Sequence, residues 1–310
     1  MDPDPPVTGF AHGPPPAGAR LVAALERAVS TAVESVDEAF AAGGPGRREP
    51  VRLARRALKE VRAVAPLCRA PRRGELVDAL VEFAGRANQL LGPVRDQDAL
   101  LRSVHRLSDR FADPVVRRTV RTVLLATLVF AHAAPREDAQ FADGAIVRAR
   151  RALRPAGELA RLLAGDGDFD AEAAVATLGR AFAQCLDELE GAMADGDLAR
   201  LHDCRKRASF LALGLRPLGD AAPAVLRRLR ARAKRLASTL GEERDLSLLD
   251  AEMRGARAQL AGSPLLVAIE DALRLARLEA GARSEDAARA LLRLRRKGVL
   301  AALDEAFGID

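Results

Sequence analysis

Helical periodicity runs through this chain from residue 20 almost to its end, and it limits the possible folds more than any other feature. Apolar residues recur at intervals of three and four positions, and no segment shows the alternation of an amphipathic β-strand. The 310 residues include ten Phe but no Trp and no Tyr, so a core must be built mainly from Leu, Ala and Val. Packed helices have this composition, and we expect an all-α protein.

Turn signals divide the pattern into segments. Gly43-Gly44-Pro45 ends the first helix, and Gly165-Asp166-Gly167-Asp168 marks the strongest internal boundary. The expected helices span 20–42, 49–68, 74–91, 94–110, 113–134 and 138–164 before this boundary, and 171–194, 198–216, 223–240, 242–261, 264–281 and 285–306 after it. The expected N-caps are Asp113, Asp170, Asp197, Ser263 and Ser284. Residues 1–19, rich in Pro and Gly, are expected to form a disordered tail.

Two charged signatures occur twice, in the same order. A basic helix, Val51–Arg62, is followed by Leu91-Gly-Pro-Val-Arg-Asp96; a second, Leu201–Ala212, is followed by Leu240-Gly-Glu-Glu-Arg-Asp245. Apolar helices align by chance, but two charged signatures in one order are harder to attribute to coincidence. We therefore predict an internal duplication, with halves at about 20–165 and 168–306, each an antiparallel helical bundle.

Each basic helix is expected to carry a cationic ridge beside an apolar stripe. Positions i, i+3, i+4, i+7 and i+10 hold Arg52, Arg55, Arg56, Lys59 and Arg62 in the first helix, and His202, Arg205, Lys206, Ser209 and Ala212 in the second. The stripes consist of Ala54, Leu58, Val61 and Ala65, and of Cys204, Ala208, Leu211 and Leu215. The simplest alternative is that each ridge is only the solvated face of a surface helix. Because the ridge occurs in both halves, this alternative is weaker.

The charge balance points to an anionic partner. The formal net charge is +6 and the sequence pI is about 10.0. Only four of the 49 basic residues are Lys, but a GC-rich genome explains an Arg bias equally well, so placement rather than number must carry the interpretation. The lack of Trp and Tyr argues against stacking of nucleic-acid bases, and the Phe residues are expected in the core.

Several classes of function are disfavoured. Three widely spaced cysteines suggest no disulfide framework, which favours a cytoplasmic location, and no apolar run is long enough to span a membrane. No His or Cys spacing suits a metal, and no phosphate-binding loop or carboxylate cluster suits phosphoryl transfer. We therefore expect no metal, no cofactor and no enzymatic activity.

These signatures resemble those of the CHAD family, the conserved-histidine α-helical domains. The resemblance covers about residues 20–306, and its most specific parts are Leu91-Gly-Pro-Val-Arg-Asp-Gln-Asp98 and Leu201-His-Asp-Cys-Arg-Lys206. It implies two helical bundles related by a pseudo-twofold axis, with a basic central cavity that binds inorganic polyphosphate without catalysis. The chain departs from the family pattern where Arg52 replaces a His and where Ser209 and Ala212 replace basic residues, so a shorter second ridge is expected.

The candidate polyphosphate-binding residues follow from the ridges and the second signatures. They are Arg52, Arg55, Arg56, Lys59, Arg62, Arg86, Arg95, His202, Arg205, Lys206, Arg235 and Arg244. The pKa of His202 should be lowered by the neighbouring cations. Asp96 and Asp245 either orient a basic side chain or form a simple interhelical ion pair. The alternative functions are a nucleic-acid-binding or granule-associated scaffold, and a cryptic phosphohydrolase.

Overall fold

The computed structural model describes residues 15–131, 135–165, 169–195, 198–255, 257 and 264–309. Within these ranges the regular elements are helices, without a strand, so the expected all-α class is confirmed. The α-helices are α1 (Ala17–Ala42), α2 (Arg48–Val64), α3 (Gly74–Leu90), α4 (Gly92–Ser108), α5 (Pro114–Ala131), α6 (Pro135–Leu153), α7 (Ala156–Gly165), α8 (Ala171–Asp195), α9 (Leu198–Gly214), α10 (Ala224–Gly255), α12 (Leu266–Leu292) and α13 (Arg296–Phe307). Short 3₁₀ helices are η1 (Gly44–Arg47), η2 (Ala65–Cys68) and η3 (Arg216–Ala221).

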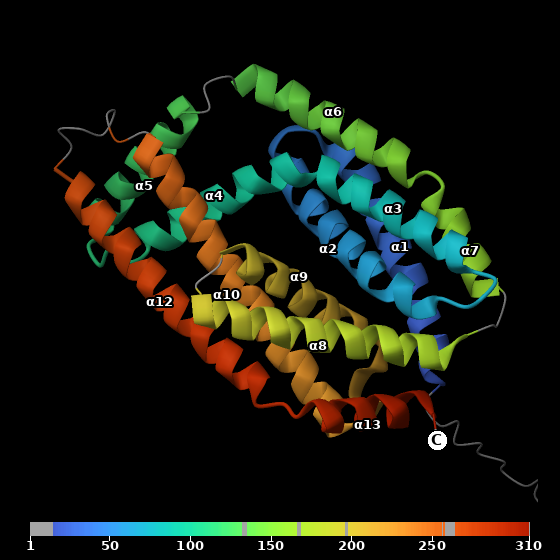
Figure 1. Cartoon of the computed structure of the whole chain (residues 1–310). Helices are drawn as coiled ribbons and strands as arrows, with labels where there is room; N and C mark the ends of the chain where they lie inside the picture. The colour runs from blue at the N-terminus through green and yellow to red at the C-terminus, as the bar shows by residue number, and fades with distance from the viewer. Residues whose placement is uncertain are drawn as a thin grey trace, which may run out of the picture.

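The first part of the chain is organised around a hairpin of α1 and α2. Helix α3 packs on α2, and α6 and α7 pack on both α1 and α3 (Figure 1). The predicted apolar stripe of α2 is buried, because Ala54, Leu58 and Val61 turn toward these neighbours. That orientation leaves the basic side chains of α2 outside the buried core.

The second part has a similar hairpin, formed by α8 and α9. Helix α10 packs on α9, α12 packs on α10, and α13 returns to α8. The rings of Phe169 and Phe307 stack with centroids 6.0 Å apart, which joins the start of α8 to the end of α13. A Cβ atom at Gly18 would lie 2.6 Å from the Phe169 ring, so glycine permits the close approach of α1 to this stack.

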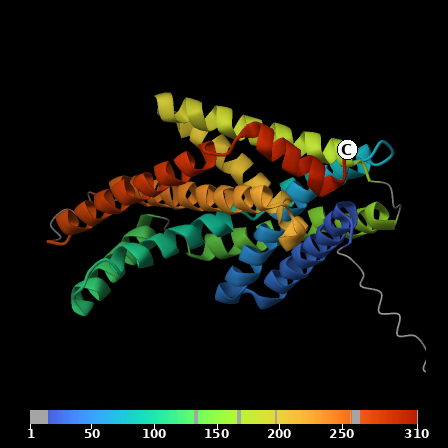
Figure 2. The ribbon, with the colours of Figure 1, turned by 90° about the horizontal axis from the view of Figure 1, so that it is seen from below.

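The hydrophobic core is shared between the two parts of the chain. The larger cluster includes Leu58 of α2 and Leu211 of α9, each 0% exposed, and it extends through α1, α3, α8 and α10. A smaller cluster lies among α4, α5, α10 and α12, where Leu107, Leu124 and Leu249 are buried. Figures 1 and 2 show these four helices extending together to one end of the molecule. Each cluster therefore combines residues from before and after the expected internal boundary.

Two expected helix boundaries are wrong. Helix α10 continues through Gly241, because Leu240 and Leu246 on either side are buried; their packing offsets the roughly 1 kcal/mol that a mid-helix glycine costs. Helix α12 continues through Ser284, which is 6% exposed and lies inside the helix rather than at its start. The chain turns instead at residues 293–295, before α13.

Other local predictions are confirmed where the structure describes them. The Asp113 carboxylate accepts the Val115 amide at 2.7 Å, and Asp170 accepts the Ala173 amide at 2.8 Å, so both residues cap helices. Pro155 separates α6 from α7, at the expected bend. The predicted caps Asp197 and Ser263 lie outside the described residues, as do residues 1–14 of the expected tail, whereas residues 17–19 already belong to α1.

Candidate functional site

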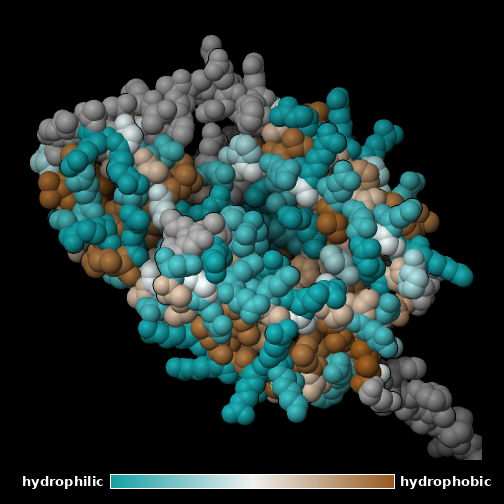
Figure 3. Space-filling model, in the orientation of Figure 1, coloured by the Kyte–Doolittle hydropathy of each residue, from teal (hydrophilic) through white to brown (hydrophobic). Residues whose placement is uncertain are grey.

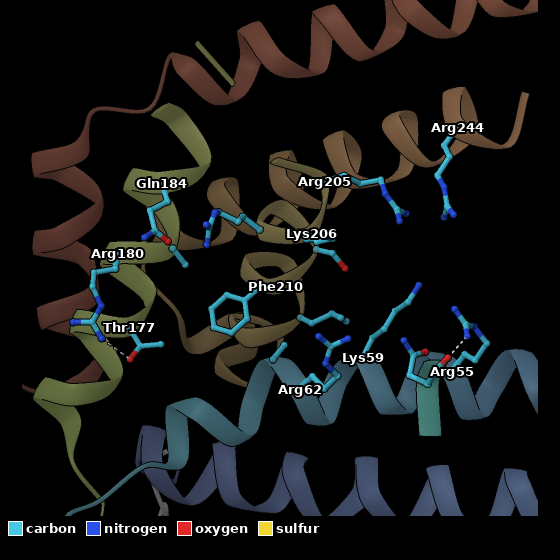
Figure 4. A pocket seen from close by; sticks show the side chains of 16 residues that line it. Arg55, Lys59, Arg62, Thr177, Arg180, Gln184, Arg205, Lys206, Phe210 and Arg244 are labelled. Carbon is cyan, nitrogen blue, oxygen red and sulfur yellow. Dashed lines mark hydrogen bonds between the residues drawn. The ribbon is translucent and has the colours of Figure 1, made fainter. Parts of the chain in front are cut away.

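A pocket of about 530 Å³ lies between the two basic helices, α2 and α9. Side chains from α3, α8 and α10 complete its walls (Figure 4). In the space-filling view, hydrophilic side chains gather around a hollow at the centre of the face, where α2 and α9 meet (Figure 3). Part of the basic side of each of these two helices therefore faces the pocket.

The pocket is strongly cationic. Eight of its sixteen lining residues are basic, and none of the sixteen is Asp, Glu or His. The basic residues are Arg55, Lys59 and Arg62 from α2, Arg180 from α8, Arg205, Lys206 and Arg207 from α9, and Arg244 from α10. Because cations gathered this closely repel one another, the pocket favours a ligand with several negative charges.

Backbone at the C-terminal end of α3 anchors Arg55. Its Nη1 donates a hydrogen bond to the carbonyl oxygen of Asn88, one of the last carbonyls of that helix. Such carbonyls lack an intrahelical partner and carry partial negative charge, so they attract a guanidinium. This contact orients the Arg55 side chain along the wall of the pocket.

The glycine of each second signature lies beside the corresponding arginine. A Cβ atom on Gly92 would be 3.8 Å from Arg55 Nη1, and one on Gly241 would be 3.7 Å from Arg205 Nη1. Both are ordinary van der Waals distances, so alanine would fit at either position, but a longer side chain would compete with the guanidinium for space. Each of these glycines therefore lies beside an arginine of a basic helix.

The lining cations differ in their contacts with carboxylates. Lys206 Nζ lies 2.8 Å from Asp203 Oδ1, and Arg207 Nε lies 2.6 Å from Glu188 Oε1. By contrast, Arg62, Arg180 and Arg244 form no salt bridge within the part of the chain that the structure describes. These three are the cations that a bound anion would most directly neutralise.

The ridge expected on α2 divides between two pockets. At about 100° per residue, Arg56 is turned about 100° from Arg55, and it lines a separate pocket of about 430 Å³ with Arg27 and Arg216. Arg52 does not line the central pocket; its Nε donates to Glu49 Oε2 at 2.7 Å, and this contact raises its pKa. The structure therefore brings only Arg55, Lys59 and Arg62 of the predicted ridge into one site.

His202 lies near the pocket cations without lining the pocket. Its pKa is lowered, because partial burial disfavours the imidazolium and because Lys206, Arg205 and Arg244 repel it; Asp203 opposes the effect. The predicted direction is confirmed, but sequence reasoning named only the neighbouring charges, whereas burial is the larger cause.

Of the remaining predicted residues, some line the pocket and others do not. Arg205, Lys206, Ser209 and Arg244 line the pocket, but Arg86, Arg235 and Ala212 do not. The backbone of Arg95 belongs to α4, but its side chain lies outside the described residues.

The second-signature aspartates had two alternative roles, and one contact bears on them. Asp245 is 8% exposed, and its Oδ2 lies 3.9 Å from Arg106 Nη2 on α4. This ion pair connects α10 to α4.

Sequence reasoning missed the wall that α8 provides. Thr177, Arg180, Ala181 and Gln184 line the pocket at positions i, i+3, i+4 and i+7 of that helix. Phe210 and Arg207 of α9 were also missed, the former because phenylalanine was expected in the core. The spacing on α8 was visible in the sequence, but nothing in it indicated which helix that face would meet.

The structure also bears on the cysteines, on metal binding and on membrane spanning. Cys68, Cys185 and Cys204 are buried and free, with Cys185 Sγ 3.8 Å from Cys204 Sγ. Among the described residues, no group of three or more His, Cys, Asp or Glu side chains is arranged to hold a metal ion. No helix in the described part is both long and apolar enough to cross a membrane.

Fold and pocket together define an all-helical protein with a cationic pocket between two basic helices. The family model of the CHAD domain matches residues 23–254, from the first turns of α1 to the end of α10, and the chain belongs to this family. The resemblance inferred from the two signatures is thereby confirmed. Searches of curated proteins and of solved structures returned no match.

Proposed function

We propose that this protein binds inorganic polyphosphate, without turnover, in the pocket between α2 and α9. The observation that carries the proposal is the lining itself: eight cations from four helices and no acidic residue. Membership of the CHAD family is consistent with a polyphosphate-related function. Binding of this kind would allow the protein to associate with polyphosphate granules in the cytoplasm.

The chemistry of the lining suits a linear chain of phosphates. Polyphosphate carries about one negative charge per phosphate and offers only hydrogen-bond acceptors, which arginine forks and lysine ammonium groups match. By analogy with nucleic-acid backbones, release of condensed counterions would drive much of the binding. Hydrolysis is not expected, because the lining has no carboxylate or imidazole to act as a base or to hold a metal ion.

We also propose that the two halves are a duplication related by a pseudo-twofold axis. The matching positions of Gly92 beside Arg55 and of Gly241 beside Arg205 support this, because they involve corresponding residues of both signatures. Under this proposal the pocket lies between equivalent surfaces, and each half supplies part of one binding site.

The decisive experiment compares two single substitutions on α2. Arg62→Ala removes a cation that lines the pocket, whereas Arg56→Ala removes the same charge from a residue that lines another pocket. We expect Arg62→Ala to weaken binding of long-chain polyphosphate about tenfold at low salt, as loss of a charge-assisted contact would. Arg56→Ala should change the affinity less than about twofold.

Three results would count against the proposal. Equal weakening by both substitutions would mean that general surface charge, not the pocket, holds the ligand. Tighter binding of RNA or duplex DNA than of polyphosphate, at equal phosphate concentration, would favour a nucleic-acid scaffold. Release of phosphate from polyphosphate, with or without added Mg²⁺, would identify a hydrolase.

A further inference from the structure

Phe210 is an aromatic residue in the wall of an otherwise cationic pocket. It is partly buried against the larger core cluster, and it lines the pocket together with Arg62, Arg180 and Gln184. Figure 4 shows its ring in the space between the α8 side chains and the cations of α2. The pocket therefore has two ends of different chemistry.

The cationic end consists of residues from α2, α9 and α10, among them Arg55, Lys59, Arg205 and Arg244 (Figure 4). The other end is formed by Thr177, Arg180 and Gln184 of α8, with the Phe210 ring beside them. There Arg180 Nη2 lies 3.3 Å from Thr177 Oγ1 and donates a hydrogen bond to it, which directs the guanidinium along α8.

A chain of phosphates alone does not account for the second end. The face of an aromatic ring carries partial negative charge, so a phosphate is repelled from it, whereas a neutral planar group stacks on it. The Gln184 amide presents both donors and an acceptor, but phosphate oxygens can use only the donors. Beside the Arg180 guanidinium, the Phe210 ring and the Gln184 amide thus suit a flat, neutral group whose edge has both donors and acceptors.

We infer that the pocket accepts nucleoside polyphosphates, with the base at the α8 end and the phosphates along the cationic end. The Phe210 ring would stack on the base, and Gln184 would bond to its edge. The volume of about 530 Å³ lies within the range of about 300–1,000 Å³ that is typical of small-molecule sites. This inference rests on the proposed function, because the same cations would hold the phosphates.

The test compares ATP with inorganic tripolyphosphate, by calorimetry in magnesium-free buffer at one ionic strength. Tripolyphosphate carries at least as much charge, so electrostatics alone predicts that it binds as tightly as ATP or more tightly. Stacking of a base is expected to make ATP bind about tenfold more tightly instead. Phe210→Leu should abolish this preference, because it should lower the affinity for ATP about tenfold and that for tripolyphosphate much less; leucine retains most of the apolar packing.

Two further variants keep the test decisive. Phe40→Leu is the matched control, because Phe40 is 50% exposed on α1 and does not line the pocket; it should leave both affinities unchanged. Gln184→Ala should weaken the binding of ATP more than that of tripolyphosphate, and it provides a second readout if Phe210→Leu lowers stability.

Tripolyphosphate binding as tight as that of ATP would overturn the inference and leave the proposed function intact. A preference for ATP that persists in both Phe210→Leu and Gln184→Ala would also overturn it. If neither ligand nor long-chain polyphosphate binds, the inference and the proposed function fail together.

Discussion

The salt dependence of polyphosphate binding can be worked out from the pocket. At about 0.7 released counterions per contact, the value for single-stranded nucleic acid, all eight lining cations give a slope of log K against log salt of about −5.6. If Lys206 and Arg207 stay paired with Asp203 and Glu188 and contribute nothing, the slope is about −4.2. Between 50 and 200 mM salt, affinity should therefore fall roughly 300- to 2,000-fold.

Removing one cation should make the slope less steep by a defined amount. Arg62→Ala takes away one lining cation, so the slope should become shallower by about 0.7, whereas Arg56→Ala should leave it unchanged. The assay is fluorescence anisotropy of end-labelled long-chain polyphosphate at five NaCl concentrations, with thermal melting to confirm folding. A wild-type slope shallower than about −2, or one that Arg62→Ala does not alter, would refute the reasoning.

Three other predictions concern titration, thiol chemistry and the core. The lowered pKa of His202 leaves its imidazole mostly neutral at pH 7, and a bound polyanion should raise that pKa. The affinity for polyphosphate should therefore increase as pH falls from about 8 to about 6. NMR titration of the imidazole, with His202→Gln as control, tests this. Burial raises the pKa of Cys68 to about 12, and the hydrogen bond with Cys204, together with burial, raises that of Cys185. Because all three cysteines are buried, a thiol reagent at pH 8 should label them only after denaturation, and rapid labelling of the folded protein would contradict their burial. Leu249→Ala should lower the free energy of unfolding by about 2–5 kcal/mol, because Leu249 is 0% exposed in the smaller core cluster. Chemical denaturation measures this change, and a value below about 1 kcal/mol would mean that the cluster contributes little to stability.

Much of the site was predictable because a helix converts sequence spacing directly into a face. The apolar stripes on α2 and α9 identified their buried sides, and burial of Leu58 and Leu211 confirms them. The spacing placed the basic residues of α2 beside its stripe, and three of the five, Arg55, Lys59 and Arg62, do line one pocket. The repeated signatures also identified the family, because charged residues in a fixed order are rarely produced by packing requirements alone.

Helix boundaries were less predictable because local propensity is weak. In the sequence, Gly241 predicts the end of a helix, and Ser284 predicts a helix N-cap. Burial of neighbouring side chains stabilises a continuous helix by more than a glycine or a serine costs, so α10 and α12 pass through both positions.

The sequence by itself determined the helical class, the buried faces of α2 and α9, and the excess of positive charge. Only the tertiary structure decided which exposed faces meet. It turned Arg56 toward another pocket, brought α8 and Phe210 into the wall, and joined α4 and α5 to α10 and α12 in one cluster. The reason is that periodicity describes one helix at a time, whereas a pocket depends on contacts between residues far apart in the chain, such as Arg62 and Arg244.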